Sequence, residues 1–404
     1  MSLLDVLLIS RCPPFPLYFG DRLIPYHLAR QLSARHHHID LVAFYTKPED
    51  AADIPRYERF FRHIQLIREP SRGVLRYLWR LYGEHFFPGK AREAWSGEMW
   101  QTVQERIFSG RYDVIQLFGG IQVYEYREAV KAYANLIVPY ESYSLYLEHE
   151  LAQPTRRVPF VRRAELSMTR RYEKRMFSGF DQVVVVAQAD ADALHQINSA
   201  LPISVIPNGV DTDYFTPNGQ EPDEPALLFI GNYDYAPNVE AALQLARHIF
   251  PAVKLRVPQA RLMLVGNAPP PVLQALASAD IDVTGTVPDV RPYYEQALIF
   301  VSPLQSGAGI KNKILEAMAM QKAIVATPLS CDGIDLENEK HLLIVDTSEA
   351  IVKAIVRLIK DGALRQRIAL ASRQLIESRY TWQRVATQYE TLYRTLADRK
   401  AGRI

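Results

Sequence analysis

The chain has 404 residues, which is too long for one ordinary core and suggests two or three domains at roughly 150 residues each. Its composition is 48% hydrophobic, 23% charged and 10% aromatic, which is typical of a soluble globular protein and excludes a disordered, collagen-like or coiled-coil chain. The 47 basic and 45 acidic residues leave a formal charge of +2, so the charge balance indicates no nucleic-acid partner.

The chain shows no feature of an exported or membrane-spanning protein. Its opening apolar run, residues 3–9, is interrupted by Asp5 and lacks the basic flank and the small-residue cleavage site of an export signal. No run of about 18 apolar residues occurs. The two cysteines, Cys12 and Cys331, are far apart, which excludes a disulfide framework and a cysteine-rich zinc site. We therefore expect a cytoplasmic protein that is at most peripheral at the inner face of the membrane.

Strand and helix patterns alternate through the first half of the chain. A buried strand at 3–10 is followed by a proline-rich loop and by a helical pattern that runs from Leu23 to Leu32. Further strands are predicted at 39–44, 114–117, 136–138 and 182–187. Strands that alternate with helices are typical of βαβ units in a parallel sheet.

The segment 56–100 interrupts this alternation because it mixes arginines with many aromatic residues. One interpretation is a set of amphipathic helices whose aromatic side chains pack on the sheet. The other is a basic, aromatic surface that contacts an anionic membrane or a lipid-linked acceptor. Paired basic residues also recur at near-helical spacing, at Arg156–Arg157, Arg162–Arg163, Arg170–Arg171 and Lys174–Arg175. Peripheral membrane contact is therefore a hypothesis for this half of the chain.

A second series of strands follows residues 203–206. These strands are predicted at 227–230, 262–265, 298–302, 323–327 and 342–345, with helices at 238–249, 310–321, 348–360 and 363–378. The pattern predicts an α/β protein with two doubly wound parallel-sheet domains, at 1–205 and 206–380. A last helical stripe, within residues 381–404, is expected to return to the first domain.

The best place for chemistry is the turn from strand to helix at 303–316, since ligands of open α/β sheets bind at the carboxyl ends of strands. A glycine-containing turn leads into exposed backbone N–H groups, beside Lys311 and Lys313. Amides and cations in this arrangement favour a diphosphate. Glu316, about one and a half turns further on, has the reach to accept hydrogen bonds from ribose or sugar hydroxyls. From these residues alone, an ordinary turn with solvated lysines is an equal alternative.

Five segments extend this interpretation by resemblance. They read IPNGVDTDYF at 206–215, FIGNYDYAPN at 229–238, GTVPDV at 285–290, GIKNKILEAMAM at 309–320 and YTW at 380–382. In this order they resemble the retaining glycosyltransferases of family 4, which have the GT-B fold. The resemblance implies two Rossmann-like domains that face a central cleft, with acceptor-side residues 1–205, donor-side residues 206–380 and a crossing helix at 381–404.

The resemblance also implies roles for single residues. Gly20 would let the donor diphosphate approach backbone amides, and Val287 would bind the nucleotide base through its main chain. Gly309 and Ile310 would offer amides to the phosphates, and Glu316 would bind the ribose hydroxyls. The loop that contains Gly231 and Asn232 would also contact the donor.

Two positions depart from the family pattern. Ala308 replaces the first of the family's usual pair of glutamates, so that only Glu316 remains. The loop after Gly231 lacks the usual arginine and lysine for the phosphates. We therefore predict that Lys311, and Lys313 beside it, supply the missing positive charge. The acceptor-side His–Asp pair of the family is also absent, and Glu141 at the comparable strand end is the catalytic candidate there.

Other acidic and histidine clusters are better explained without a metal. Residues 211–213 spell Asp-Thr-Asp but fall in the interdomain turn, where a capping or hinge role is favoured. His36–His38 is expected in a solvated loop, because three consecutive residues cannot all face one ion on regular structure. Residues 148–150 lack the second histidine of a zinc-protease helix. We predict no structural or catalytic metal.

The combined hypothesis is a retaining, metal-independent hexosyltransferase of polysaccharide or glycoconjugate synthesis. Its donor substrate would be a nucleotide diphosphate sugar, its acceptor a saccharide or a lipid-linked saccharide, and it would need no cofactor. Ala308 and the altered loop after Gly231 motivate a first alternative, a catalytically decayed nucleotide-sugar-binding subunit. A second alternative is a GT-B enzyme that epimerises or hydrolyses nucleotide sugars. The sequence leaves the oligomeric state open.

Overall fold

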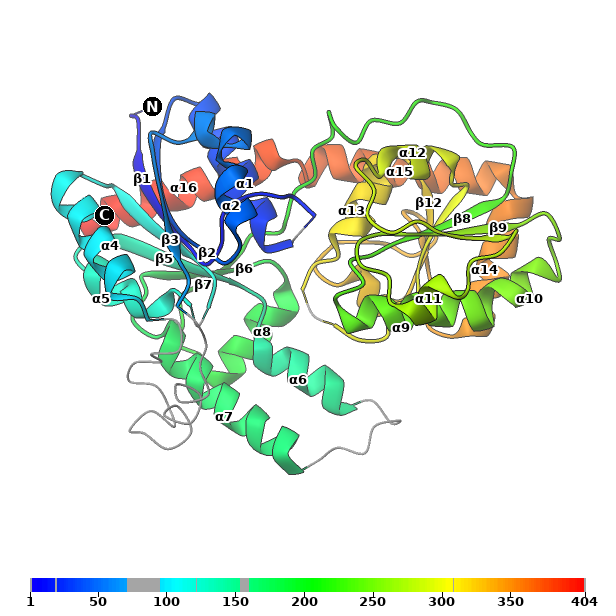
Figure 1. Cartoon of the computed structure of the whole chain (residues 1–404), viewed down its shortest axis with the longest axis horizontal. Helices are drawn as coiled ribbons and strands as arrows, with labels where there is room; N and C mark the ends of the chain where they lie inside the picture. The colour runs from blue at the N-terminus through cyan, green and yellow to red at the C-terminus, as the bar shows by residue number, and fades with distance from the viewer. Residues whose placement is uncertain are drawn as a thin grey trace. The chain divides into compact units, whose positions relative to one another are not determined.

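The structure of the chain is a computed structural model that describes residues 2–18, 20–70, 95–120, 122–152, 160–307 and 309–402. It divides into two compact units, one of residues 1–207 and 382–404 and the other of residues 208–381 (Figure 1). Each unit contains its own parallel sheet. The predicted pair of doubly wound α/β sheets is thus confirmed. Most of the arginine-rich aromatic segment 56–100 and the pair Arg156–Arg157 lie outside the described residues.

The first unit contains a seven-stranded sheet in the order β3-β2-β1-β4-β5-β6-β7. Its strands are β1 (Asp5–Ser10), β2 (His38–Tyr45), β3 (His63–Arg68), β4 (Val114–Phe118), β5 (Ala134–Tyr140), β6 (Gln182–Val185) and β7 (Ile203–Val205). The central strands β1 and β4 are almost wholly buried, as their continuous apolar runs predict. They pair with each other although they are not consecutive, so the strand order reverses between them, at a topological switch point.

Strand β3 corrects the sequence interpretation of the segment 56–100, for which helices were expected. It pairs in parallel with β2 at the edge of the sheet, and most of its residues are only half-buried. Its ends are polar, at His63 and Arg68, and this combination conceals the strand pattern. The helices of this unit are α1 (Gly20–Ala34), α2 (Pro48–Ala52), α4 (Gly97–Ser109), α5 (Arg127–Val130), α6 (Tyr143–Ala152), α7 (Phe160–Phe177), α8 (Gln188–Ile197) and α16 (Trp382–Lys400), with 3₁₀ turns η1 (Ile54–Arg56), η2 (Glu58–Phe60) and η3 (Tyr124–Tyr126).

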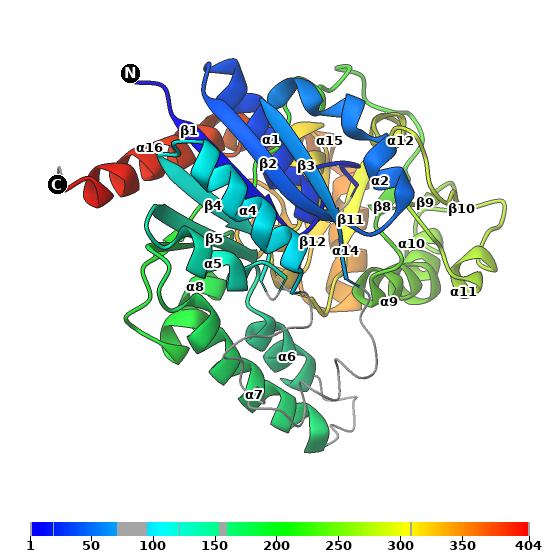
Figure 2. The same cartoon turned by 60° about the vertical axis from the view of Figure 1, so that its left-hand side comes forward.

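Helix α16 belongs to the first unit and packs on α1, β4 and β5, which confirms the predicted return of the last helix (Figure 2). The rings of His27 and Trp382 stack with their centroids 4.6 Å apart. His37, expected in a solvated loop, is instead buried: its Nδ1 accepts a hydrogen bond from the amide of Leu4 at 3.0 Å, and its Nε2 lies 3.3 Å from Glu390 of α16. That expectation was wrong because α16 covers the histidine.

The second unit contains a six-stranded sheet in the order β10-β9-β8-β11-β12-β13. Its strands are β8 (Ala226–Ile230), β9 (Arg261–Val265), β10 (Ile281–Val283), β11 (Ile299–Ser302), β12 (Ala323–Ala326) and β13 (Leu343–Ile344). Its helices are α9 (Ala236–Gln244), the π-helical turn η4 (Leu245–Ile249), α10 (Phe250–Lys254), α11 (Pro271–Gln274), α12 (Arg291–Gln296), α13 (Asn312–Ala319), the 3₁₀ turn η5 (Pro328–Cys331), α14 (Ser348–Lys360) and α15 (Gly362–Arg379). The strand order reverses between β8 and β11, which is the switch point of this unit.

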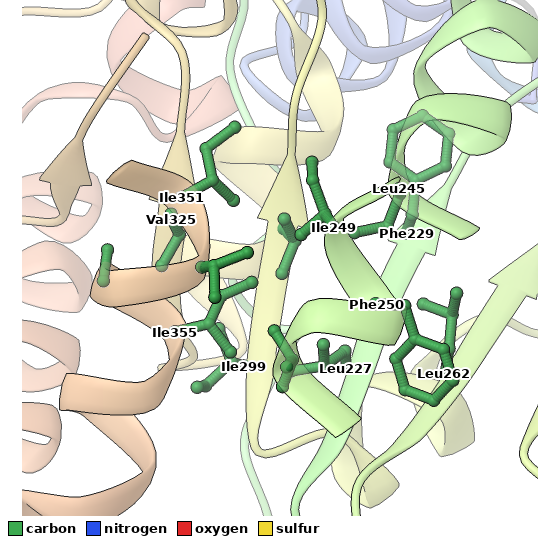
Figure 3. Packing of buried hydrophobic residues seen from close by; sticks show 14 of the residues in the cluster. Leu227, Phe229, Leu245, Ile249, Phe250, Leu262, Ile299, Val325, Ile351 and Ile355 are labelled. Carbon is green, nitrogen blue, oxygen red and sulfur yellow. The ribbon is translucent and has the colours of Figure 1, made fainter. Parts of the chain in front are cut away.

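A buried hydrophobic core holds the strands of this second sheet against η4, α10 and α14 (Figure 3). Leu227 and Phe229 of β8 and Ile299 of β11 contribute to it, and Ile351 and Ile355 of α14 pack on the same face. Burial of such side chains contributes about 1.5–3 kcal/mol each relative to exposure. The core therefore fixes the positions of the strand ends from which the loops of the switch point begin.

Candidate functional site

The candidate site lies at the switch point of the second unit, where the loops after β8 and β11 leave adjacent strands. Phe300 of β11 pairs with Leu228 of β8, so both strands end at the same edge of the sheet. Open α/β sheets bind their ligands at the carboxyl ends of strands, at this kind of position. The predicted residues Gly231 and Asn232 follow β8, and Gly309 and Ile310 follow β11.

The loops after β8 and β9 touch through glycine. Gly266 has a φ of +149°, and a Cβ atom there would lie 1.7 Å from the carbonyl oxygen of Gly231. No residue with a side chain can take this position without moving the loop that follows β8. The amide of Gly231 in turn donates to the carbonyl oxygen of Val265 at 3.0 Å. The backbone of Gly231 is thereby fixed beside the switch point.

Asn232 shapes the same loop with its own polar groups. Its Oδ1 accepts hydrogen bonds from the amide of Asp234 at 3.2 Å and from Nδ2 of Asn267 at 3.3 Å. Its carbonyl oxygen accepts from Nδ2 of Asn238 at 2.8 Å. Asn267 Oδ1 accepts from the hydroxyl of Thr286 at 2.7 Å, which joins the loops after β8, β9 and β10. Asn232 and Asn267 together therefore link three loops around the site.

Helix α13 begins later than the sequence predicted, at Asn312 instead of residue 310. Gly307 and Gly309, with φ values of +112° and +70°, are in the left-handed region, so the chain turns before the helix starts. Lys311 is the N-cap residue and its side chain does not cap the helix. The first amides of a helix have no intrahelical acceptor, and the positive end of the helix dipole lies there. This helix start is suited to hold an anion.

The two predicted lysines differ in their surroundings. Lys311 Nζ donates to the carbonyl oxygen of Gly309, within the turn itself. Lys313 Nζ lies 3.3 Å from Glu316 Oε1, so its charge is shared with that carboxylate. The assignment of the phosphate charge to Lys311, ahead of Lys313, stays a prediction.

Glu316 is 9% exposed, and its carboxylate is held on both sides. The hydroxyl of Tyr294 lies 3.2 Å from Oε2, opposite the contact of Lys313 with Oε1. Burial, together with the nearby Glu316 carboxylate, keeps the pKa of the Tyr294 hydroxyl well above its ordinary value. The hydroxyl therefore stays protonated and donates a hydrogen bond to Glu316. Sequence reasoning missed Tyr294, because an aromatic residue in a short helix is more often part of the core.

The predicted base loop is fastened to the segment that precedes β8. Val287 is half-buried in this loop. Asp289 accepts a hydrogen bond from Arg291 Nη2 at 2.7 Å and from the hydroxyl of Tyr214 at 3.2 Å. The guanidinium of Arg291 lies 4.0 Å from the centroid of the Tyr214 ring, and its hydrogen bonds lower the pKa of Asp289. The segment that contains Tyr214 and the base loop that contains Asp289, 75 residues apart in the sequence, are thus joined by direct side-chain contacts.

The predicted residues of the first unit lie at the carboxyl edge of its sheet. Gly20 is exposed at the first residue of α1, and Glu141 is exposed directly after β5. The amide of Ser142 donates to Asp190 Oδ1 at 2.8 Å, and the Ser142 and Ser144 hydroxyls donate to Glu173. Two buried carboxyl groups therefore hold the turn that carries Glu141. Ala308, the other predicted departure, lies outside the described residues.

An arginine that sequence reasoning missed occupies the switch point of the first unit. Arg11 follows β1, and its Nη2 lies 2.8 Å from Asp21 Oδ2. Its guanidinium lies 5.2 Å from the ring centroid of Tyr140, whose hydroxyl donates to the carbonyl oxygen of Asp21 at 2.8 Å. A Cβ atom on Gly119, where φ is +117°, would lie 2.9 Å from Arg11 Cδ. The sequence signal that could have revealed this close approach is the glycine directly after β4.

Acidic clusters have structural roles where the structure describes them. Asp211 Oδ1 accepts a hydrogen bond from the amide of Tyr214 at 3.2 Å, so this residue of the Asp-Thr-Asp sequence stabilises a turn. In the described ranges, no group of three or more histidine, cysteine, aspartate or glutamate side chains is arranged to hold a metal ion. Of the helices that the structure describes, none has the length and apolar character needed to cross a membrane.

Family comparisons match both halves of the chain. Residues 25–214 match the model of "Glycosyltransferase Family 4", and residues 224–361 match that of "Glycosyl transferases group 1". The chain is 27% identical over 203 residues to the phosphatidyl-myo-inositol mannosyltransferase of Mycobacterium leprae. That alignment covers 48% of this chain and 53% of the mannosyltransferase. The chain is 23% identical over 168 residues to an uncharacterized 44.6 kDa protein in the cps region of Klebsiella pneumoniae, at 39% and 43% coverage. These alignments span about half the length of each relative.

Solved structures match almost the whole chain. Sucrose-phosphate synthase from Thermosynechococcus elongatus superposes with a TM-score of 0.73 at 19% identity, over 97% of this chain and 99% of that one. HepE from Anabaena, in complex with UDP and glucose, superposes with a TM-score of 0.68 at 14% identity, over 96% and 99%. At identities this low, the superpositions show a shared fold and nothing further.

Proposed function

Because the chain belongs to the glycosyltransferases of family 4 and group 1 and has the GT-B fold, we propose that it transfers a hexose from a nucleotide diphosphate sugar to a saccharide or lipid-linked acceptor. In this proposal the anomeric configuration is retained, and the reaction needs neither a metal nor a resident cofactor. The enzyme would act in the cytoplasm, in polysaccharide or glycoconjugate synthesis.

The start of α13 carries this proposal. It combines a left-handed glycine turn, uncapped helix amides and the ammonium group of Lys311 at the switch point of the second sheet. In hexosyl transfer, negative charge builds up on the departing nucleoside diphosphate. Amides and a cation at that position would stabilise the charge without reorganisation. Glu316, on the same helix, has accepting oxygens for ribose hydroxyls.

The comparisons suggest which substrates to test first. HepE has been solved with UDP-glucose and with UDP, so UDP-glucose is the first donor to test. The mannosyltransferase from Mycobacterium leprae is named for a phosphatidyl-myo-inositol substrate, which supports lipid-linked acceptors as a class. Peripheral contact with an anionic membrane would fit such an acceptor. The exposed arginines of α7, among them Arg163, Arg170 and Arg171, support that contact.

The test is binding and turnover with a panel of UDP-, GDP- and ADP-hexoses, by calorimetry and saturation-transfer NMR. Binding of at least one sugar nucleotide is expected, and binding of none would refute the proposal. Lys311→Ala should weaken that binding about 10- to 150-fold, as loss of a charged hydrogen bond implies. Lys353→Ala, which removes an exposed lysine of α14, is the matched control and should bind like the unaltered protein.

Product analysis separates the two alternatives from transfer. A binding subunit would hold the donor without releasing a nucleoside diphosphate, even with lipid extracts as acceptor. An epimerase or hydrolase would release the nucleoside diphosphate or change the sugar without any acceptor product. Glycosylated acceptor with retained configuration, observed by NMR of the new anomeric proton, is the result that the proposal requires.

A further inference from the structure

Tyr294 is the fourth residue of α12, a helix of six residues between the base loop and β11. Its side chain is fully buried. The ring lies against Phe300 of β11, with centroids 5.8 Å apart, and edge-on to Phe215, at 6.3 Å and 90°. Contacts on two sides hold the ring in one orientation, so the direction of its hydroxyl is set by the core.

The Tyr294 hydroxyl has one proton and two acceptors within reach. Glu316 Oε2 lies at 3.2 Å and the carbonyl oxygen of Lys313 at 3.4 Å. A carboxylate is the stronger acceptor because the hydrogen bond to it is charge-assisted. The proton therefore goes to Glu316, and the carbonyl contact helps to hold the hydroxyl against α13.

The second carboxylate oxygen of Glu316 receives Lys313 Nζ at 3.3 Å. The lysine side chain is 33% exposed and flexible, so it supplies charge but little orientation. The rigid donor of the pair is Tyr294. With one donor on each oxygen, the carboxylate plane is fixed, and each oxygen keeps a further lone pair for a ligand.

We propose that Tyr294 is a positioning residue that orients the Glu316 carboxylate to accept hydrogen bonds from both hydroxyls of a nucleotide ribose, an inference that rests on the proposed function. Neighbouring ribose hydroxyls are two donors at a fixed separation. A carboxylate accepts both only if its plane is held in one orientation. Tyr294 therefore contributes to the selection of ribonucleotides over deoxyribonucleotides.

The experiment measures dissociation constants for UDP, 2′-deoxy-UDP and 3′-deoxy-UDP, or for the matching set of the base that the donor panel selects. The unaltered protein should prefer UDP by about 10- to 150-fold, since each deoxy compound loses a hydrogen bond to a charged group. Tyr294→Phe should narrow that preference about 3- to 10-fold, mainly by weakening UDP. Tyr57→Phe alters a buried tyrosine whose hydroxyl has no hydrogen-bond partner among the residues that the structure describes, and it should leave the preference unchanged.

Two substitutions by non-standard amino acids guard against loss of folding. Replacement of Tyr294 by 4-fluorophenylalanine keeps the volume and removes the donor, so it should reproduce the narrowed preference. Replacement by 4-aminophenylalanine restores an N–H donor and should recover most of it. If Tyr294→Phe prefers UDP over its deoxy forms as strongly as the unaltered protein does, the inference is overturned. If Tyr294→Phe does not fold, the fluorinated variant gives the same test. In either case, binding of UDP leaves the proposed function intact. If the unaltered protein binds no nucleoside diphosphate, the proposed function itself fails.

Discussion

Lys322→Met should make the protein more stable at neutral pH. Lys322 stands directly before β12, at the amino edge of the second sheet, and its side chain lines a cavity of about 330 Å³ beside Glu295 and Glu221. The residue is 8% exposed, and Nζ makes one long hydrogen bond, 3.4 Å to the carbonyl oxygen of Glu295. Burial lowers the pKa of Lys322 from 10.5 to about 8, although Glu295 and Glu221 act in the opposite direction.

The magnitude follows from the pKa of Lys322 in the folded and unfolded chain. The difference between about 8 and 10.5 corresponds to about 3 kcal/mol against folding with a charged lysine. Below pH 8 the lysine is charged in both states, so the whole cost is present. Between pH 8 and 10.5 the unfolded chain binds more protons than the folded chain, so stability rises with pH as the cost is relieved. A methionine of similar length avoids the cost at every pH.

The assay is urea unfolding of both proteins at pH 7, 8, 9 and 10, followed by circular dichroism. At pH 7 the variant should gain about 1–3 kcal/mol, and the gain should shrink steadily toward pH 10. Lys353→Met, at an exposed position of α14, should show neither effect. A loss of stability at pH 7 would show that the two glutamates outweigh burial. A gain that does not change between pH 7 and 10 would show that the charge of Lys322 is not its source. Either result would refute the reasoning.

Three further substitutions test the fold and the site. Glu390→Gln should lower the free energy of unfolding by about 1–3 kcal/mol at neutral pH. The reason is that hydrogen bonds from Arg394 and Arg35 overcome burial and lower the pKa of Glu390 to about 2. Because that pKa is depressed, the difference in stability between the two proteins should vanish in thermal unfolding as the pH falls from 4.5 through about 2. Gly266→Ala should lower the melting temperature and abolish UDP binding in a thermal-shift titration, and unchanged binding would contradict the close approach of the loops after β8 and β9. Trp382→Ala should cost about 3–5 kcal/mol in chemical unfolding by emptying its place against α1; a cost below 1 kcal/mol would show that α16 contributes little to the first unit.

Most of the fold was predictable because its central strands are buried on both faces. β4 and β8 are wholly apolar apart from Gln116, and such runs between turn residues are typical of parallel sheets. β3 escaped prediction because an edge strand is half solvated and loses that pattern. The burial of His37 escaped it for another reason: the helix that covers it lies about 350 residues away in the sequence, and no local pattern records such a contact.

The candidate site was predictable only where it is local. Lys311 and Glu316 share one turn-and-helix segment, so their spacing alone places them together. Tyr294 reaches Glu316 across 22 residues, and Arg11 meets Tyr140 through a ring contact between two strand ends. These pairs depend on which strands are neighbours in the sheet. A sequence pattern gives strands and helices, but the order of strands in the sheet decides which loops meet.

The hydrogen bonds between the loops would allow a site with few charges to bind its ligand tightly. Asn232, Asn267 and Thr286 form a continuous chain of side-chain contacts across the loops that follow β8, β9 and β10. Asp289 and Arg291 then fasten the last of these loops to Tyr214. A loop that is ordered before the ligand arrives loses less conformational entropy on binding. Backbone amides in such loops would therefore contribute more to donor affinity than the same amides in a loop that must first be ordered, and we expect this gain to offset the missing arginine and lysine after β8.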